Sequence, residues 1–156
     1  MLELKTGCDE VAGAQRNLFC GPPWAYLRQI LGVAAAQGVA SWFQNSRIYY
    51  VHLGRVAIRY ACELLGIGKD DEILVPAYNC GSEIDPLLCS GASLNLYRID
   101  HAANIDLNDL QERMSKKTRA IYVTHYFGMP QPLVEIRALC RDRKIHLIED
   151  CALSLF

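Results

Sequence analysis

The regular alternation of helical and strand patterns from Arg55 onward constrains the fold of this chain more than any other feature. A helix is expected over residues 55–65, because apolar residues recur there at three- and four-residue spacing and Gly66 follows as a stop. Residues 72–76, EILVP, form a short apolar run closed by Pro76, as in a buried strand. A helix followed by a strand is therefore the first structural unit.

The same alternation recurs three more times along the chain. Helices are expected within 82–90, 106–114 and 132–142, and strands at 93–97, 119–125 and 145–150. Ser82 and Asp85 are expected to cap the first of these helices with Pro86 in its first turn, and Asp106 is expected to cap the next. Crossover helices between apolar strands predict an α/β fold, an open and mostly parallel sheet with helices on both faces.

Composition and charge exclude several classes of protein for this chain. The chain has 156 residues, is 51% hydrophobic and carries a net charge of −1, which excludes a disordered or coiled-coil protein and gives no field that attracts nucleic acid. The longest apolar stretch, Ile30 to Phe43, is shorter than the ~20 residues of a membrane-spanning helix, so we expect no membrane span. We interpret residues 1–50 as an N-terminal helical arm and 51–156 as the main unit.

The cysteines and histidines do not indicate a metal site. The seven cysteines are odd in number and contain no CxxC pair, which favours reduced thiols. The four histidines have no metal-ligand spacing with one another or with the cysteines, so no metal is expected. The first residues are acidic and have no basic segment followed by an apolar one, as a secretory signal would. These features predict a cytoplasmic protein.

In parallel α/β sheets, ligands bind at the carboxyl ends of the strands, so residues that bind a ligand are expected there. Asp150 ends an apolar strand, where a carboxylate is costly to bury unless something pairs with it. It either lies under a cationic group of a ligand, or caps the following turn or meets an internal arginine. Glu149 should point to the opposite face and form a structural ion pair.

Four further residues are candidates for binding or chemistry. Gly54 precedes a helix N-terminus, which favours an anion such as phosphate, and Arg55 adds positive charge; an ordinary entry turn is the alternative. His125 follows a strand and could orient a ligand or serve acid-base chemistry, although a lone histidine is more often structural. Cys80 also lies at a strand end. No GxGxxG or GxxxxGK[ST] motif is present.

Several segments in register resemble a known family. They read GRVAIRYACELLGIGKDDEILVPAYNC, then GASLNLYRIDHAANIDLNDLQERMSKKTRAIYVTHYFGMPQ, then HLIEDCA. From about His52 to Phe156 the chain resembles the DegT/DnrJ/StrS family of pyridoxal-phosphate-dependent sugar aminotransferases, which have the aspartate aminotransferase fold type. A flavodoxin-like or other nucleotide-binding α/β domain shares the element order but explains none of these segments.

The resemblance implies a cofactor, pyridoxal 5'-phosphate, and residues that contact it. Gly54, Arg55 and Val56 match the turn that binds the cofactor phosphate; the family's hydroxyl residue is missing there, and Arg55 would replace it with a charge. Cys80 matches the position that stacks on the pyridine ring, and Tyr78 the aromatic position before it. Asp150 matches the aspartate that pairs with the pyridinium nitrogen. The resemblance also implies a keto-sugar substrate, nucleotide-linked, and a homodimer for the intact enzyme.

The chain departs from the family pattern in one decisive respect. The family's Schiff-base lysine lies a few tens of residues beyond the ED motif, and it matches none of the lysines here: Lys5, Lys69, Lys116, Lys117 and Lys144. Residues 51–156 would then be the N-terminal half of the large domain, with no catalytic residue assigned and no activity alone. An incomplete sheet would expose an edge and favour aggregation or a completing partner.

A second departure keeps a different class of function open. Leu153 stands where the family has a glutamine or histidine beside the ring hydroxyl, and leucine cannot donate that hydrogen bond. The alternative to a fragment of an aminotransferase is therefore a non-catalytic domain, either degenerate or a partner that completes a related subunit.

Overall fold

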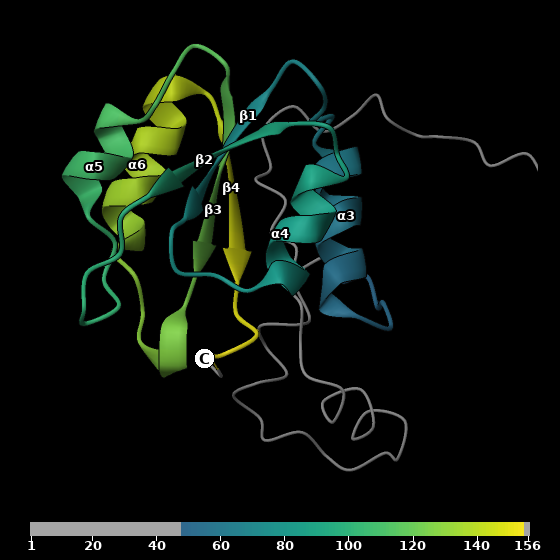
Figure 1. Ribbon diagram of the computed structural model, residues 1–156, viewed down its shortest axis with the longest axis horizontal. Helices are drawn as coiled ribbons and strands as arrows, with labels where there is room; N and C mark the ends of the chain where they lie inside the picture. The colour runs from purple at the N-terminus through teal and green to yellow at the C-terminus, as the bar shows by residue number, and fades with distance from the viewer. Residues whose placement is uncertain (1–47, 155–156) are drawn as a thin grey trace, which may run out of the picture.

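The computed structural model describes residues 48–154, which form a single four-stranded parallel sheet (Figure 1). The strands are β1 (Glu72–Pro76), β2 (Ser93–Tyr97), β3 (Thr118–Thr124) and β4 (His146–Asp150), in the order β2-β1-β3-β4. All three pairings are parallel. The predicted α/β class and the approximate positions of all four strands are confirmed.

Helices cover both faces of this sheet, as predicted (Figure 1). Helices α3 (Gly54–Leu64) and α4 (Gly81–Leu88) pack on one face. Helices α5 (Leu107–Glu112) and α6 (Leu133–Arg143) pack on the other. A short 3-10 helix, η1 (Tyr126–Gly128), follows β3. We call the two sides the α3/α4 face and the α5/α6 face.

Side chains alternate between these faces along each strand, as the two-residue period of a strand requires. On β3, Ala120 and Tyr122 pack against the α3/α4 face, whereas Ile121 and Val123 belong to the opposite core. On β4, Ile148 packs on the α3/α4 side. This alternation directs Asp150, two residues later, toward the α3/α4 face and Glu149 toward the α5/α6 face.

The ends of two helices follow the sequence signals closely. After α3, Gly66 adopts a φ of +65°, and the Ile67 N–H donates to the Cys62 carbonyl over 2.9 Å, which closes the helix with the expected glycine stop. Asp106 caps α5 as predicted, because its Oδ1 accepts the N–H groups of Asn108 and Asp109 at 3.1 Å each.

The start of α4 differs from the prediction. The helix begins at Gly81 with Cys80 as its N-cap and no side-chain cap, so Ser82 lies inside the first turn and does not cap it. The extended backbone of Cys80 turns its carbonyl into the helix, where it accepts the Glu83 N–H at 3.0 Å. Pro86 consequently falls in the second turn. The carbonyl that its missing N–H leaves unpaired belongs to the exposed Ser82.

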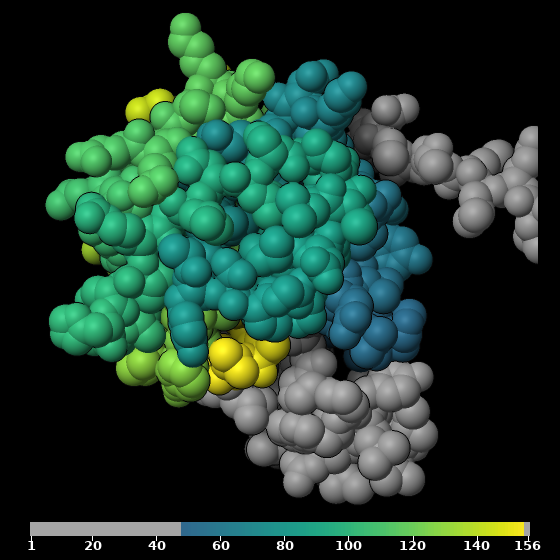
Figure 2. Space-filling model, in the orientation of Figure 1, coloured from purple at the N-terminus to yellow at the C-terminus, as the bar shows by residue number. Residues whose placement is uncertain are grey.

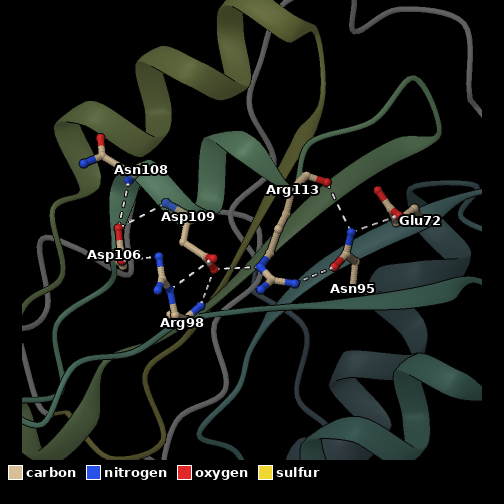
Figure 3. A network of polar contacts seen from close by, with 7 residues as sticks. All are labelled: Glu72, Asn95, Arg98, Asp106, Asn108, Asp109 and Arg113. Atoms are coloured by element: carbon tan, nitrogen blue, oxygen red, sulfur yellow. Dashed lines mark hydrogen bonds and ion pairs between the residues drawn. The ribbon is translucent and has the colours of Figure 1, made fainter.

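A polar network attaches α5 to the edge strand β2 (Figure 3). The buried Asp109 carboxylate accepts the Arg98 backbone N–H and the Arg113 Nε, both at 2.7 Å. Asn95 of β2 donates to the Arg113 carbonyl over 3.2 Å. These bonds give the short helix α5 a fixed position that its six residues would not secure alone.

The expected N-terminal helical arm, including the apolar stretch Ile30 to Phe43, lies outside the described residues apart from 48–50. Within 48–154, no helix combines the length and the apolar character needed to cross a bilayer.

Candidate functional site

The carboxyl ends of the four strands meet at one edge of the sheet, together with the N-termini of α3 and α4 (Figure 1). Both helices run opposite to the strands, because each connects to a strand through a short turn. In Figure 2 the residues that follow β4 (yellow) reach the surface beneath the teal residues that include α4. The topology therefore brings the predicted positions Gly54, Cys80 and Asp150 to the same edge.

Asp150 is the most buried carboxylate at this edge, with 8% of its surface exposed. Its Oδ1 accepts the Ala152 N–H over 2.8 Å, and the Tyr122 hydroxyl donates to its Oδ2. The carboxylate thus caps the turn after β4, as one of the two interpretations proposed. Among the ion pairs of residues 48–154 none involves Asp150, so its charge is held by hydrogen bonds on the α3/α4 face.

Glu149 lies on the opposite face and forms the predicted structural ion pair. Its Oε1 is 2.9 Å from Arg137 Nη2, and its Oε2 is 3.5 Å from His125 Nε2. His125 is itself buried, and its Nδ1 accepts the Gln131 N–H at 3.3 Å. The His125 imidazole is therefore engaged on the α5/α6 face, away from the side to which the Asp150 carboxylate points.

The start of α3 presents positive charge at the same edge. Leu53, the N-cap, supplies no side-chain hydrogen bond, and both Gly54 and Arg55 are exposed. Val56 is half-buried and donates its N–H to the Leu53 carbonyl over 3.1 Å. Arg55 forms no ion pair with any described residue. A helix N-terminus with an uncommitted guanidinium suits a phosphate group.

The loop after β1 carries the two remaining predicted positions. Tyr78 is 57% exposed, and its ring centroid lies 5.3 Å from that of Tyr126 at an interplanar angle of 46°. The Tyr126 hydroxyl donates to the Tyr78 carbonyl, and burial raises the pKa of Tyr126 to about 12, which keeps this donor protonated at neutral pH. Cys80 is exposed, with its Sγ 2.6 Å from Ser82 Oγ.

Sequence reasoning missed three polar side chains at this edge: Tyr122, Thr124 and Glu83. Tyr122 bonds to Asp150, Thr124 pairs with Asp150 in the register of β3 and β4, and burial together with the Asp150 charge raises the pKa of Glu83. The only sequence signal for the first two was their even spacing along an apolar strand. Which strand lies beside β4, and in what register, is not visible in that spacing.

The described lysines lie at the other edge of the sheet. Lys69 precedes β1, Lys116 and Lys117 precede β3, and Lys144 precedes β4, all in connections that enter the amino ends of strands. A five-residue strand is roughly 17 Å long, so this distance separates them from the carboxyl edge. Lys5 lies outside the described residues.

The parallel sheet and the polar residues at the carboxyl ends of its strands define a class of protein. It is an open parallel α/β domain of the kind found in the large domain of pyridoxal-phosphate-dependent aminotransferases. The sequence pattern of the DegT/DnrJ/EryC1/StrS aminotransferase family matches residues 37–155, which is most of the chain. The chain belongs to this family.

Solved structures similar to this chain are aminotransferases. The sugar aminotransferase CalS13 from Micromonospora echinospora is 30% identical with a TM-score of 0.64, covering 87% of this chain and 37% of the other. The aminotransferase from Psychrobacter cryohalolentis is 29% identical with a TM-score of 0.63, covering 65% and 26%. These likenesses confirm the predicted fold type.

Among curated proteins, GDP-perosamine synthase from Vibrio cholerae is 30% identical over 100 residues, or 64% of this chain and 27% of that protein. A dTDP-4-dehydro-2,3,6-trideoxy-D-glucose 4-aminotransferase from Saccharopolyspora spinosa is 24% identical over 110 residues, or 70% and 29%. The chain therefore spans little more than a quarter of the length of these relatives.

Proposed function

We propose that this chain provides the N-terminal part of the large domain of a pyridoxal-phosphate-dependent aminotransferase that acts on a nucleotide-linked keto sugar. The observation that carries the proposal is the buried Asp150 carboxylate, which Tyr122 and Ala152 hold at the carboxyl end of β4. The nucleotide-sugar aminotransferases among its relatives support the substrate class. The intact enzyme would be a homodimer in the cytoplasm.

The residues of this edge suit pyridoxal 5'-phosphate at both ends of the molecule. The start of α3 at Gly54, with Arg55 and Val56, offers backbone donors and a positive charge to the phosphate. Asp150 offers a carboxylate to a protonated ring nitrogen, and its two hydrogen bonds fix the position of that carboxylate. When bound, the cofactor supplies an electron sink for the carbanion formed in amino-group transfer.

The loop after β1 would flank the ring. Tyr78 is exposed and held through its carbonyl by the Tyr126 hydroxyl, and Cys80 begins α4 at the family's stacking position. In this proposal, Cys80 and Tyr78 contact the pyridine ring of the cofactor and limit its movement. His125 is left out of the ring contacts, because Glu149 and Gln131 hold its imidazole on the other face.

The chain by itself would bind the cofactor without catalysing transamination. Four of its lysines lie at the amino edge of the sheet, remote from Asp150, and no other side chain within residues 48–154 can hold the cofactor covalently and move the proton between carbon atoms. A polypeptide segment that carries the Schiff-base lysine would have to supply this group.

The test is a spectrum of the purified 156-residue chain after mixing with pyridoxal phosphate and gel filtration, with and without borohydride. We expect a retained chromophore that borohydride does not attach to the chain. Asp150→Ala should lose the chromophore, whereas Asp142→Asn, an exposed change on α6, should keep it. Retention that is equal in Asp150→Ala and the unaltered chain would refute the assignment of Asp150.

A non-catalytic domain is the second candidate, and two observations favour it. Leu153 is 52% exposed and offers no hydrogen-bond donor, and Cys80, an exposed thiol, stands where the family resemblance implies an aromatic residue that stacks on the ring. If the chain retains no cofactor and instead forms a defined complex with a separate aminotransferase subunit, this candidate replaces the first.

A further inference from the structure

Two buried oxygen atoms at the candidate site have no hydrogen-bond partner. They are Glu83 Oε2 and Thr124 Oγ1, and no other buried side-chain nitrogen or oxygen within residues 48–154 shares this condition. Thr124 is only 2% exposed. Buried polar atoms in folded proteins nearly always have a hydrogen-bond partner. Two buried oxygens without one, both at the carboxyl edge of the sheet, therefore point to a ligand.

The fold brings both atoms to Asp150. Thr124 ends β3 and pairs in register with Asp150, so the two side chains leave neighbouring strands in the same direction. Two residues earlier, Tyr122 points to the same face and donates its hydroxyl to Asp150. The Tyr126 hydroxyl gives its only proton to the Tyr78 carbonyl, so it donates none to Thr124 Oγ1, which has no partner of hydrogen-bond geometry.

Glu83 approaches the same point from the helix layer. It lies in the first turn of α4, on the face that the Asp150 carboxylate also faces. Burial raises the pKa of Glu83, and the Asp150 charge raises that pKa further, so the two carboxyl groups interact. Two carboxylates facing each other in a partly buried place repel, and a cation between them relieves that repulsion.

We propose that Glu83 and Thr124 complete the subsite around Asp150 that receives the protonated nitrogen of a heterocyclic ring. Glu83 supplies a second negative group near the ring cation through Oε2, the oxygen that has no partner in the unliganded chain, and Thr124 Oγ1 supplies a further polar atom beside Asp150. This inference rests on the proposed function, since the ring that Asp150 would hold there is that of pyridoxal phosphate.

The binding experiment uses the full chain and two probes, pyridoxal phosphate and its analogue with CH in place of the ring nitrogen. Glu83→Gln should weaken binding of pyridoxal phosphate by about tenfold, the value of one hydrogen bond to a charged group. It should leave binding of the carbon analogue unchanged. Glu135→Gln, the same change at an exposed position of α6, is the matched control and should affect neither probe.

Each outcome of the binding experiment separates the inference from the function. If Asp150→Ala loses pyridoxal phosphate while Glu83→Gln binds it as the unaltered chain does, the proposed function stands and the inference fails. If Glu83→Gln weakens both probes equally, its role is structural and the inference fails. If the unaltered chain binds neither probe, the proposed function is wrong and the inference falls with it.

A second measurement does not depend on any ligand. If the Thr124 hydroxyl is unpaired in the unliganded chain, Thr124→Val removes a buried polar atom without losing a bond, so the melting temperature should stay equal or rise. Pyridoxal phosphate binding by the same variant should weaken. A fall in melting temperature would mean that the hydroxyl is already paired, which would overturn the subsite.

Discussion

Thr118 and Thr124 begin and end the same strand, both are buried, and their surroundings are opposite. The Thr118 hydroxyl donates to Glu72 over 2.7 Å and accepts the Ser115 N–H at 2.8 Å. The Thr124 hydroxyl has no partner. At the amino edge the buried threonine is satisfied within the chain, whereas at the carboxyl edge it is not.

This difference indicates that the amino edge of the sheet contributes to stability, whereas the carboxyl edge is suited to binding. At the amino edge, Glu72 alone accepts the hydroxyls of Ser115 and Thr118 at 2.9 and 2.7 Å and the Asn95 amide at 3.3 Å (Figure 3 shows the last contact). At the carboxyl edge, Glu83 Oε2 and Thr124 Oγ1 are buried without a hydrogen-bond partner. Such unsatisfied groups cost stability and are expected where ligands bind.

The largest effect is expected at the amino edge, from Glu72→Ala. This substitution leaves the hydroxyls of Ser115 and Thr118 without their acceptor and removes one of the two acceptors of the Asn95 amide, so we expect the free energy of unfolding to fall by about 2–3 kcal/mol. Urea denaturation followed by circular dichroism measures it. A loss no greater than that of the exposed control Glu112→Ala would show that water replaces Glu72 at no cost.

The two threonines give the sharpest comparison, because the same substitution should have opposite signs. Thr118→Val should lower the free energy of unfolding by about 1 kcal/mol, as it removes two hydrogen bonds. Thr124→Val should raise it or leave it unchanged. Both variants belong in one denaturation series, and a loss of equal size at the two positions would erase the distinction between the edges.

A smaller gain is expected at Lys144, which ends α6 at the amino edge with a φ of +56°. The Cβ of a residue other than glycine is sterically strained in this left-handed conformation. Lys144→Gly should therefore raise the free energy of unfolding by about 0.5–1 kcal/mol. The same denaturation assay detects it. Pyridoxal phosphate binding should not change, since Lys144 lies at the edge opposite Asp150.

The smallest effect is a pH dependence at Glu83. The pKa of Glu83 in the folded chain lies above the ordinary value of 4.5. As the pH rises past 4.5, the unfolded chain releases the Glu83 proton first, and the folded chain still holds it. Glu83 therefore lowers stability as the pH rises through this range. Burial and the Asp150 charge raise this pKa, and hydrogen bonds from Cys80 at the start of its own helix oppose the rise.

The corresponding measurement is a pair of melting curves for Glu83→Gln and the unaltered chain between pH 4 and 7. Glutamine does not titrate, so the variant should be the more stable protein at pH 7, and its advantage should shrink toward pH 4. An advantage that is constant across this range would show that Glu83 does not titrate differently in the folded and unfolded chain.

Much of the fold could be predicted because the relevant signals are local. The apolar run at 72–76, the glycine stop at Gly66 and the cap at Asp106 each act within a few residues, and the structure has all three. The start of α4 was predicted wrongly, because Ser82 looks like a capping residue but the backbone of Cys80 already turns into the helix there.

The sequence by itself determined the alternation of helices and strands and the opposite directions of Glu149 and Asp150, since both follow from the period of one strand. Only the tertiary structure decided that β3 lies between β1 and β4, that Thr124 stands beside Asp150, and that Glu83 faces them from α4. Strand order and register depend on packing between segments far apart in the chain, and no local pattern encodes them.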